Sequence, residues 1–118
     1  MALLLDGQTI LVTGAARGLG AAFCRAIAAA GGTVLALGRD AVSLDALLTA
    51  LPGGGHSKIV GDVCDASALA AGLDGKIVHA VINNAGIAVT ATLAGGDMAD
   101  AQRVIDTNLM GALYVLQA

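Results

Sequence analysis

Aromatic and basic side chains are both scarce in this sequence. Its 118 residues include one Phe, one Tyr and no Trp, and six Lys and Arg stand against nine Asp and Glu. Modules that bind single-stranded nucleic acid stack bases on aromatic platforms, and modules that bind duplexes carry a cationic stripe. Neither feature is present, so we expect no nucleic-acid partner. The scattered basic residues can still bind one small anionic ligand.

Long apolar runs and cysteine clusters are also missing. No uncharged apolar run approaches the roughly 18 to 20 residues of a membrane span, and residues 1–6 lack the basic start of a secretion signal. Cys24 and Cys64 stand in apolar surroundings without metal-ligand spacing, and we expect both to be reduced, buried packing residues. His56 and His79 have no carboxylate or cysteine at useful spacing. These absences predict a cytoplasmic protein with no membrane partner and no metal.

What the chain has in quantity is small aliphatic residues. Hydrophobic residues make up 57% of the sequence, and short apolar runs alternate with stretches of helical periodicity. The runs predict four strands, at residues 9–13, 33–37, 58–61 and 77–82. The periodic stretches predict helices at residues 18–30, from Asp40 or Ser43 to Leu51, from Asp65 to about Leu73, and from Asp97 to the chain end.

This alternation predicts one α/β domain over residues 1–118. Right-handed crossovers between successive strands give a parallel sheet, most simply in the order 3-2-1-4, with helices on both faces. The arrangement is a Rossmann-type doubly wound sheet, truncated to about four strands. No composition change or linker marks a second domain.

A glycine-rich loop joins the first strand to the first helix. Residues 13–20 read TGAARGLG. Glycines at such a bend let the chain turn sharply, admit a pyrophosphate against bare backbone and let the helix pack closely on the sheet. The helix behind them presents unpaired N–H groups and a partial positive charge to an anion. The loop therefore indicates dinucleotide binding, although a purely structural turn would also use glycines.

The spacing of these glycines resembles the T-G-x-x-x-G-x-G signature of the short-chain dehydrogenase/reductase family. Further matches follow in the family's order along almost the whole chain. They are Asp62-Val63 after the third strand, Asn83-Asn84-Ala85-Gly86 after the fourth, and Asn108 within DTNLMG at residues 106–111.

The resemblance implies roles at the matched positions. The loop residues would hold the dinucleotide: Thr13, Gly14, Ala16, Arg17, Gly18, Leu19 and Gly20. Asp62 would bond the adenine amino group, and the Val63 backbone would contact the ring. Ala16 departs from the pattern, because related proteins often carry a hydroxyl there that reaches the adenosine phosphate.

The later matches imply ribose contacts and a part in catalysis. Asn84, Ala85 and Gly86 would line the cofactor ribose, and Asn83 would help to hold the central strands. Asn108 would open its helix locally and keep a water in the proton-relay chain, which makes it the one catalytic residue expected in this chain.

The end of the second strand favours NADP(H) over NAD(H). Rossmann domains that select NAD place an acid there for the ribose hydroxyls, whereas this chain has Gly38 followed by Arg39. The guanidinium of Arg39 can bind a 2′-phosphate, and Arg17 can close on the same group. Asp40 is near enough to compete for Arg39 but is better explained as a helix cap.

The family's catalytic serine and Y-x-x-x-K tyrosine and lysine have no counterpart here. The only tyrosine, Tyr114, is followed four residues later by Ala118, and it reads as a helix packing residue. The resemblance implies a hydride-transfer oxidoreductase for a small carbonyl or alcohol, of which this chain alone would bind cofactor without turnover. The alternative is a non-catalytic dinucleotide-binding or assembly module. A Rossmann-type methyltransferase is disfavoured, since its glycine loop lacks this spacing.

The truncation leaves an apolar sheet edge at residues 77–82. Open edges of this kind recruit partners or aggregate. We therefore expect a homo-oligomer, or a missing C-terminal half, to cover that edge.

Overall fold

The computed structural model describes residues 3–118 and has one four-stranded parallel sheet. The strands are β1 (Thr9–Thr13), β2 (Thr33–Gly38), β3 (Ser57–Val60) and β4 (Ala80–Ile82). Their order is β3-β2-β1-β4, which confirms the predicted topology. The chain first builds outward from β1 to β3 and then returns to the other side of β1, so the carboxyl ends of β1 and β4 lie next to each other.

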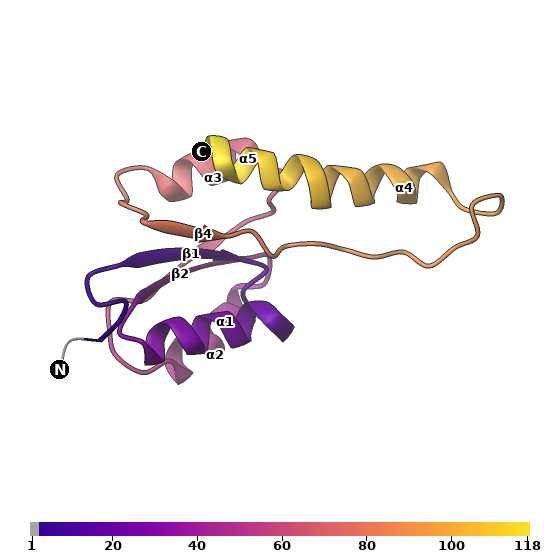
Figure 1. Ribbon diagram of the computed structural model, residues 1–118. Coiled ribbons are helices and arrows are strands. Elements are labelled where there is room, and N and C mark those ends of the chain that lie inside the picture. Colours follow the sequence, from indigo (N-terminus) through magenta and orange to yellow (C-terminus); the bar gives the residue numbers. More distant parts are fainter. Residues whose placement is uncertain (1–2) are drawn as a thin grey trace.

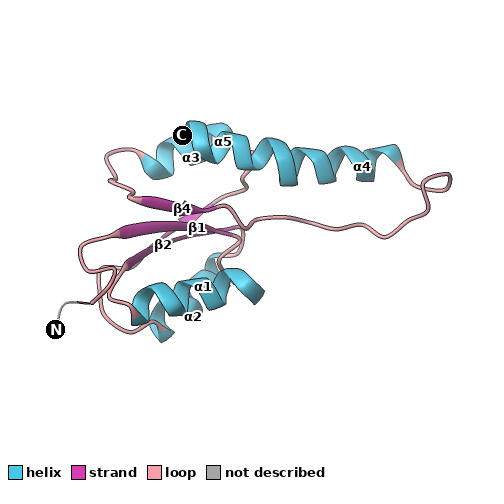
Figure 2. Ribbon diagram, viewed as in Figure 1, coloured by secondary structure: helices cyan, strands magenta, loops and turns pink. Residues whose placement is uncertain are grey.

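Helices cover both faces of the sheet, as predicted (Figure 1). In Figure 2, α1 and α2 lie below the sheet while α3 and α5 lie above it. The helical elements are α1 (Gly18–Ala29), α2 (Ala41–Ala50), α3 (Ala66–Leu73), α4 (Met98–Ile105), the π-helix η1 (Asp106–Met110) and α5 (Gly111–Gln117). The loop before α4 and α4 itself extend away from the sheet (Figure 1). None of the helices in the described part is long and apolar enough to cross a bilayer.

Alternating strand residues divide the core into two layers. Successive side chains of a strand point to opposite faces, and so Ile10 and Val12 pack with α1 and α2 while Leu11 packs with α3 and α5. Cys24 is buried in the first layer, and this burial raises the pKa of its thiol to about 11. Tyr114 packs against the second layer, which confirms its prediction as a packing residue. Because apolar groups cover both faces, the sheet presents its polar backbone only at its ends and edges.

Aspartate side chains begin three of the helices. Asp40 accepts from the backbone N–H of Val42, Asp65 from Ala68 and Asp97 from Ala99. Each carboxylate satisfies an N–H group that has no partner within its own helix. The predicted caps at these three positions are therefore confirmed.

The fourth strand is shorter than predicted. The apolar run predicts residues 77–82, but β4 pairs with β1 through only three residue pairs. The backbone N–H of His79 donates to the Thr9 carbonyl at 2.8 Å, and the Nδ1 atom of His79 accepts the Thr9 N–H at 2.9 Å. Because the His79 side chain accepts the Thr9 N–H, the regular pairing of β4 with β1 begins at Ala80, and residues 77–79 lie outside the strand. The third strand differs less, beginning and ending one residue earlier than predicted.

Several side chains that the sequence predicts to be buried are exposed. The helical periodicity places Leu19 on the buried stripe of α1, yet Leu19 is 68% exposed, and α1 instead buries Gly20, Ala21, Cys24, Ile27 and Ala28. These mostly small side chains let the helix lie close to the sheet. Cys64 is exposed rather than buried, since the turn after β3 points its side chain away from both core layers.

Removal of the Asp65 cap is expected to lower stability in a pH-dependent way. Hydrogen bonds from Ala68 N–H and the Ser67 hydroxyl hold the pKa of Asp65 below its ordinary value of 3.8. A carboxyl whose pKa is depressed by folding contributes stability above its unfolded pKa, and loses it as pH falls through the folded pKa. The urea midpoint of Asp65→Ala should therefore lie below that of the wild type near neutral pH. The difference should shrink below about pH 4.

Asp6→Ala is the control, because the Asp6 carboxylate is exposed and accepts no hydrogen bond within residues 3–118. A difference in urea midpoint between Asp65→Ala and wild type that stays constant down to pH 3 would contradict the capping role of Asp65.

Candidate functional site

The loop after β1 uses each of its glycines for a different reason. Gly14 and Gly18 have φ angles of +61° and +57°, a region that other residues enter at a cost of about 1–2 kcal/mol. A Cβ atom at Gly14 would also lie 3.0 Å from the Cα of Ala85. At Gly20 the φ angle is ordinary, but a Cβ would lie 2.0 Å from the carbonyl oxygen of Gly14. The spacing of the three glycines is therefore required by backbone geometry and close packing.

The loop leaves the N-terminus of α1 free to bind an anion. Arg17 is the N-cap residue, and its side chain makes no capping hydrogen bond. The first N–H groups of a helix have no partner within the helix, and together they favour negative charge. In α2, α3 and α4 an aspartate fills this place. The difference leaves the first turn of α1 open to a phosphate group.

A buried threonine joins the glycine loop to the chain after β4. Thr13 is fully buried, and its hydroxyl oxygen accepts the backbone N–H groups of Asn84 and Ala85, each at 2.9 Å. The Asn84 side chain donates back to the carbonyl oxygens of Thr13 and Gly14, both at 3.2 Å. Four hydrogen bonds thus fix the carboxyl ends of β1 and β4 relative to each other.

This junction changes the expected roles of the two neighbouring asparagines. The resemblance implies that Asn83 holds the central strands, but Asn83 donates to the carbonyl of Ala112 at 3.1 Å and so ties β4 to α5. Asn84 joins β1 to β4 and also borders the cavity described next. The expectation for Asn83 is therefore wrong, because it is Asn84 that joins the neighbouring strands β1 and β4.

A cavity of about 530 Å³ opens at the carboxyl ends of the strands. This volume is in the range of pockets that hold small molecules and cofactors. Eleven of the predicted binding residues line it: Gly14, Ala16, Arg17, Gly18, Leu19, Arg39, Asp62, Val63, Asn84, Ala85 and Gly86. Thr13, Gly20 and Asn108 do not line it but lie directly behind its wall, where they bond or pack against residues that do.

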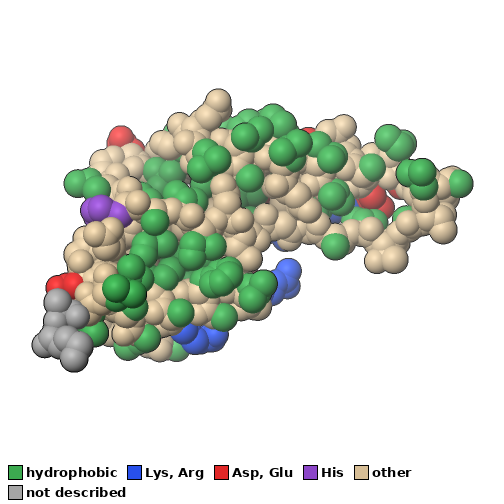
Figure 3. Space-filling view, in the orientation of Figure 1, with side chains coloured by type: hydrophobic (Ala, Val, Ile, Leu, Met, Phe, Trp, Pro, Cys, Tyr) green, Lys and Arg blue, Asp and Glu red, His purple; other side chains and the backbone are tan. Residues whose placement is uncertain are grey.

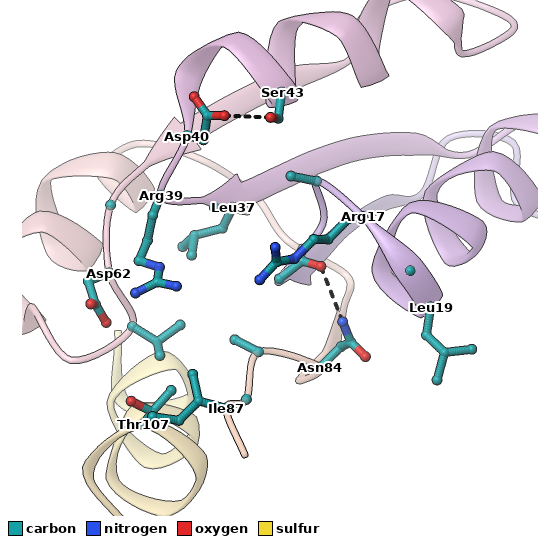
Figure 4. A pocket seen from close by; sticks show the side chains of 18 residues that line it. Arg17, Leu19, Leu37, Arg39, Asp40, Ser43, Asp62, Asn84, Ile87 and Thr107 are labelled. Carbon is teal, nitrogen blue, oxygen red and sulfur yellow. Dashed lines mark hydrogen bonds between the residues drawn. The ribbon is translucent and has the colours of Figure 1, made fainter. Parts of the chain in front are cut away.

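Two arginines border the cavity, Arg17 in the glycine loop and Arg39 after β2. Figure 4 shows the guanidinium groups of Arg17 and Arg39 pointing into the cavity from opposite sides. In the space-filling view, Lys or Arg atoms stand beside the hollow where α4 and its loop leave the body of the molecule (Figure 3). Two of the six basic residues of the chain therefore reach the cavity, which Asp40 and Asp62 also border.

Asp40 is the acid that could compete for Arg39, but its carboxylate is already bonded within α2. It accepts hydrogen bonds from the Ser43 hydroxyl and from the Val42 N–H, and these bonds hold its pKa below the ordinary range. Its carboxylate points toward Ser43 rather than toward Arg39 (Figure 4). At Gly38 a Cβ would lie 3.3 Å from the end of the Leu44 side chain, so a larger residue there would require Leu44 to shift slightly.

The turn after β3 forms the wall next to Arg39. Asp62 accepts the backbone N–H of Cys64 at 2.9 Å through one carboxylate oxygen. The neighbouring Val63 is buried and belongs to the second core layer. This anchoring leaves Asp62 at the border of the cavity with a second oxygen that can accept a hydrogen bond.

Asn108 lies in a break of the helix that the periodicity predicts as continuous from Asp97. The chain passes from α4 through the five-residue π-helix η1 into α5. The side chain of Asn108 accepts the backbone N–H of Ile87 at 2.8 Å and donates to the Ile87 carbonyl at 2.9 Å. A π-turn inserts an extra residue and is frequent at functional sites. The helix does open at Asn108, as the resemblance implies.

Seven cavity residues were not among those predicted to bind. They are Leu37, Gly38, Asp40, Ser43, Gly61, Ile87 and Thr107. Gly38, Asp40 and Gly61 are backbone neighbours of predicted residues, and Ile87 directly follows the Asn-Asn-Ala-Gly motif, so adjacency could have found them. Thr107 reaches the cavity only because η1 turns it there, which no sequence pattern signals.

The fold and the cavity agree with the matches to known proteins. The family model described as short chain dehydrogenase matches residues 8–118. Galactitol 2-dehydrogenase (L-tagatose-forming) of Cereibacter sphaeroides is 36% identical over 97% of this chain and 46% of its own length. Ketoacyl reductase HetN of Nostoc sp. is 36% identical over 92% of this chain and 40% of its own length.

A solved structure gives the same result. The 3-oxoacyl-[acyl-carrier protein] reductase of Brucella melitensis with bound NAD is 30% identical, with a TM-score of 0.89 over 95% of this chain and 47% of that one. The chain therefore belongs to the short-chain dehydrogenase family of oxidoreductases. It spans less than half the length of the two curated relatives.

Substitutions at the glycines should separate steric from conformational effects. Gly20→Ala should cost about 2 kcal/mol or more, because its Cβ would meet backbone atoms that cannot move aside. Gly18→Ala should cost roughly 1 kcal/mol, since it has open space but a positive φ. Gly54→Ala serves as the control, because nothing lies within 4 Å of the added Cβ. Urea unfolding measures all three, and equal stability of Gly20→Ala and Gly54→Ala would refute the packing argument.

Proposed function

We propose that this chain is the nicotinamide-dinucleotide-binding portion of a short-chain oxidoreductase, and that it prefers NADP(H). The observation that carries the proposal is the uncapped N-terminus of α1 behind a glycine loop that borders the cavity. Bare backbone at Gly18, where an added Cβ would meet nothing within 4 Å, leaves room for a diphosphate, and the helix N–H groups supply the matching donors. The residues present therefore fit such a cofactor.

The preference for NADP(H) follows from the charges at the end of β2. Arg39 and Arg17 supply planar, permanently charged donors that match the oxygens of a 2′-phosphate. No carboxylate stands at Gly38, where it would repel that phosphate. The Brucella melitensis reductase is described with bound NAD, and so the preference rests on these residues of this chain and not on the relatives.

The remaining residues would orient the cofactor. When bound, the nicotinamide supplies hydride transfer to or from the carbon of a small carbonyl or alcohol, the chemistry that the names of the dehydrogenase and reductase relatives suggest. Asp62 and Val63 would hold the adenine end, and Asn84, Ala85 and Gly86 the ribose. Asn108 shapes the wall through Ile87, and at the opened helix it would keep a water in the proton-relay chain. A cytoplasmic location would suit this activity.

Titration with NADPH and NADH tests the function and the preference together. Wild-type chain should bind NADPH more tightly, as read from nicotinamide fluorescence. Arg39→Ala should lower NADPH affinity by roughly tenfold to a hundredfold, because the 2′-phosphate loses a charge-assisted contact, and should change NADH affinity little. The same sample should not oxidise NADPH with a ketone, since no Y-x-x-x-K occurs in it.

Arg25→Ala is the matched control, because it removes the same charge from an exposed side chain of α1 that does not line the cavity. An NADPH-to-NADH affinity ratio equal in Arg39→Ala and wild type would refute the NADP assignment. The absence of saturable binding to either nucleotide would refute the function.

The second part of the proposal is that a partner covers an exposed apolar edge of the sheet. Val81 on β4 and Leu109, Leu113 and Leu116 along η1 and α5 are exposed, and an open parallel edge with apolar side chains recruits a partner. We propose that a second copy or a C-terminal half covers this surface. The alternative function, a non-catalytic dinucleotide-binding or assembly module, would use the same surface. Sedimentation should give a species larger than a monomer, and a monodisperse monomer would count against this coverage by a second copy.

A further inference from the structure

The helix that begins at α4 contacts both turns that border the cavity, and it does so through consecutive parts of η1 and α5. Asn108 bonds the backbone of Ile87, after β4. Thr107 bonds Cys64, after β3, with 3.6 Å between the hydroxyl oxygen and Sγ. A Cβ at Gly111 would lie 2.5 Å from Val63 Cγ2, so the start of α5 packs directly on the same turn.

The sheet alone does not set the distance between these two turns. They follow β3 and β4, the two edge strands, which are separated by β2 and β1. The cavity lies between the turns, with the glycine loop on one side and η1 on the other (Figure 4). η1 supplies a link between them on the other side of the cavity, because Thr107 and Asn108, two adjacent residues of η1, contact the turn after β3 and the chain after β4 respectively.

Thr107 is the member of this link whose side chain makes a specific bond to the turn after β3. It is half-buried and borders the cavity together with Asp62, Val63 and Ile87. Its hydroxyl meets the Cys64 thiol, and the backbone N–H of Cys64 in turn donates to the Asp62 carboxylate at 2.9 Å. Thr107 is thus bonded directly to Cys64, the residue whose N–H holds Asp62 in place.

We propose that Thr107 is a positioning residue for the adenine end of the cofactor. It fixes the turn of residues 62–64 so that the free Asp62 oxygen faces the adenine amino group. The proposal rests on the proposed function, which assigns that role to Asp62. Without the hydroxyl, the turn keeps its packing on Gly111 and the bond from Cys64 N–H to Asp62, but it loses the side-chain bond that holds Cys64 itself in place. The effect should then fall on recognition of the amino group rather than on binding of the dinucleotide as a whole.

An analogue without the amino group isolates this effect. The wild-type chain and Thr107→Val are titrated with NADPH and with reduced nicotinamide hypoxanthine dinucleotide phosphate, in which oxygen replaces the adenine amino group. Valine keeps the shape of threonine without its hydroxyl. We expect Thr107→Val to bind NADPH about three- to tenfold more weakly, with less than about a twofold change for the hypoxanthine analogue. Thr107→Ser, which restores the hydroxyl, should recover the wild-type discrimination.

Cys64→Ala tests the other end of the same bond and keeps the proposal testable if Thr107→Val does not fold. This variant should also bind NADPH more weakly while binding the hypoxanthine analogue about as well as wild type. The double variant with Thr107→Val should bind NADPH no more weakly than either single variant, as expected for two residues that act through one contact. An equal loss for both nucleotides, or no loss for NADPH, would overturn the role of Thr107 while leaving the proposed function intact. A wild-type chain that binds neither nucleotide would instead refute the function and the inference together.

Discussion

Four hydrogen bonds between the ends of β1 and β4 are the constraint on which the site depends. The buried Thr13 hydroxyl accepts two N–H groups from the chain after β4, and Asn84 returns two bonds to the glycine loop. A parallel sheet already places carboxyl strand ends at one edge, but it does not orient the loops that follow. Because this junction is satisfied entirely by polar atoms inside the fold, the glycine loop is held in place while the first turn of α1 stays open toward the cavity.

The selectivity of the cavity depends on packing as much as on charge. Leu44 of α2 is buried beside Gly38, where an added Cβ would lie 3.3 Å from its side chain. The Asp40 carboxylate is held by the first turn of α2. The same helix therefore packs closely on the position that would carry an NAD-selecting acid and binds the acid that follows Arg39. Arg39 is left as the charged side chain at the end of β2 that faces the cavity (Figure 4).

Much of this could be predicted from the sequence, because strands and caps are decided locally. Apolar runs and the aspartates Asp40, Asp65 and Asp97 gave the element order and three helix starts. The short β4 could not be predicted, since it depends on the His79 ring accepting an N–H from a residue 70 positions away. The contacts of Asn83 and Asn84 could not be predicted either, because their partners, Ala112 for Asn83 and Thr13 and Gly14 for Asn84, are distant in the sequence.

The π-helix shows why the missing parts concern long-range contact. Residues 98–117 have a helical pattern throughout, and no glycine or proline marks the break before Gly111. The extra residue in η1 is stabilised from outside: Asn108 takes up both backbone groups of Ile87, and Gly111 admits the Val63 side chain. The π-turn therefore lies where this helix meets the turns after both β3 and β4. Thr107, Asn108 and Gly111 occupy positions i, i+1 and i+4, which lie on one face of a helix, so a single face of this helix contacts both turns.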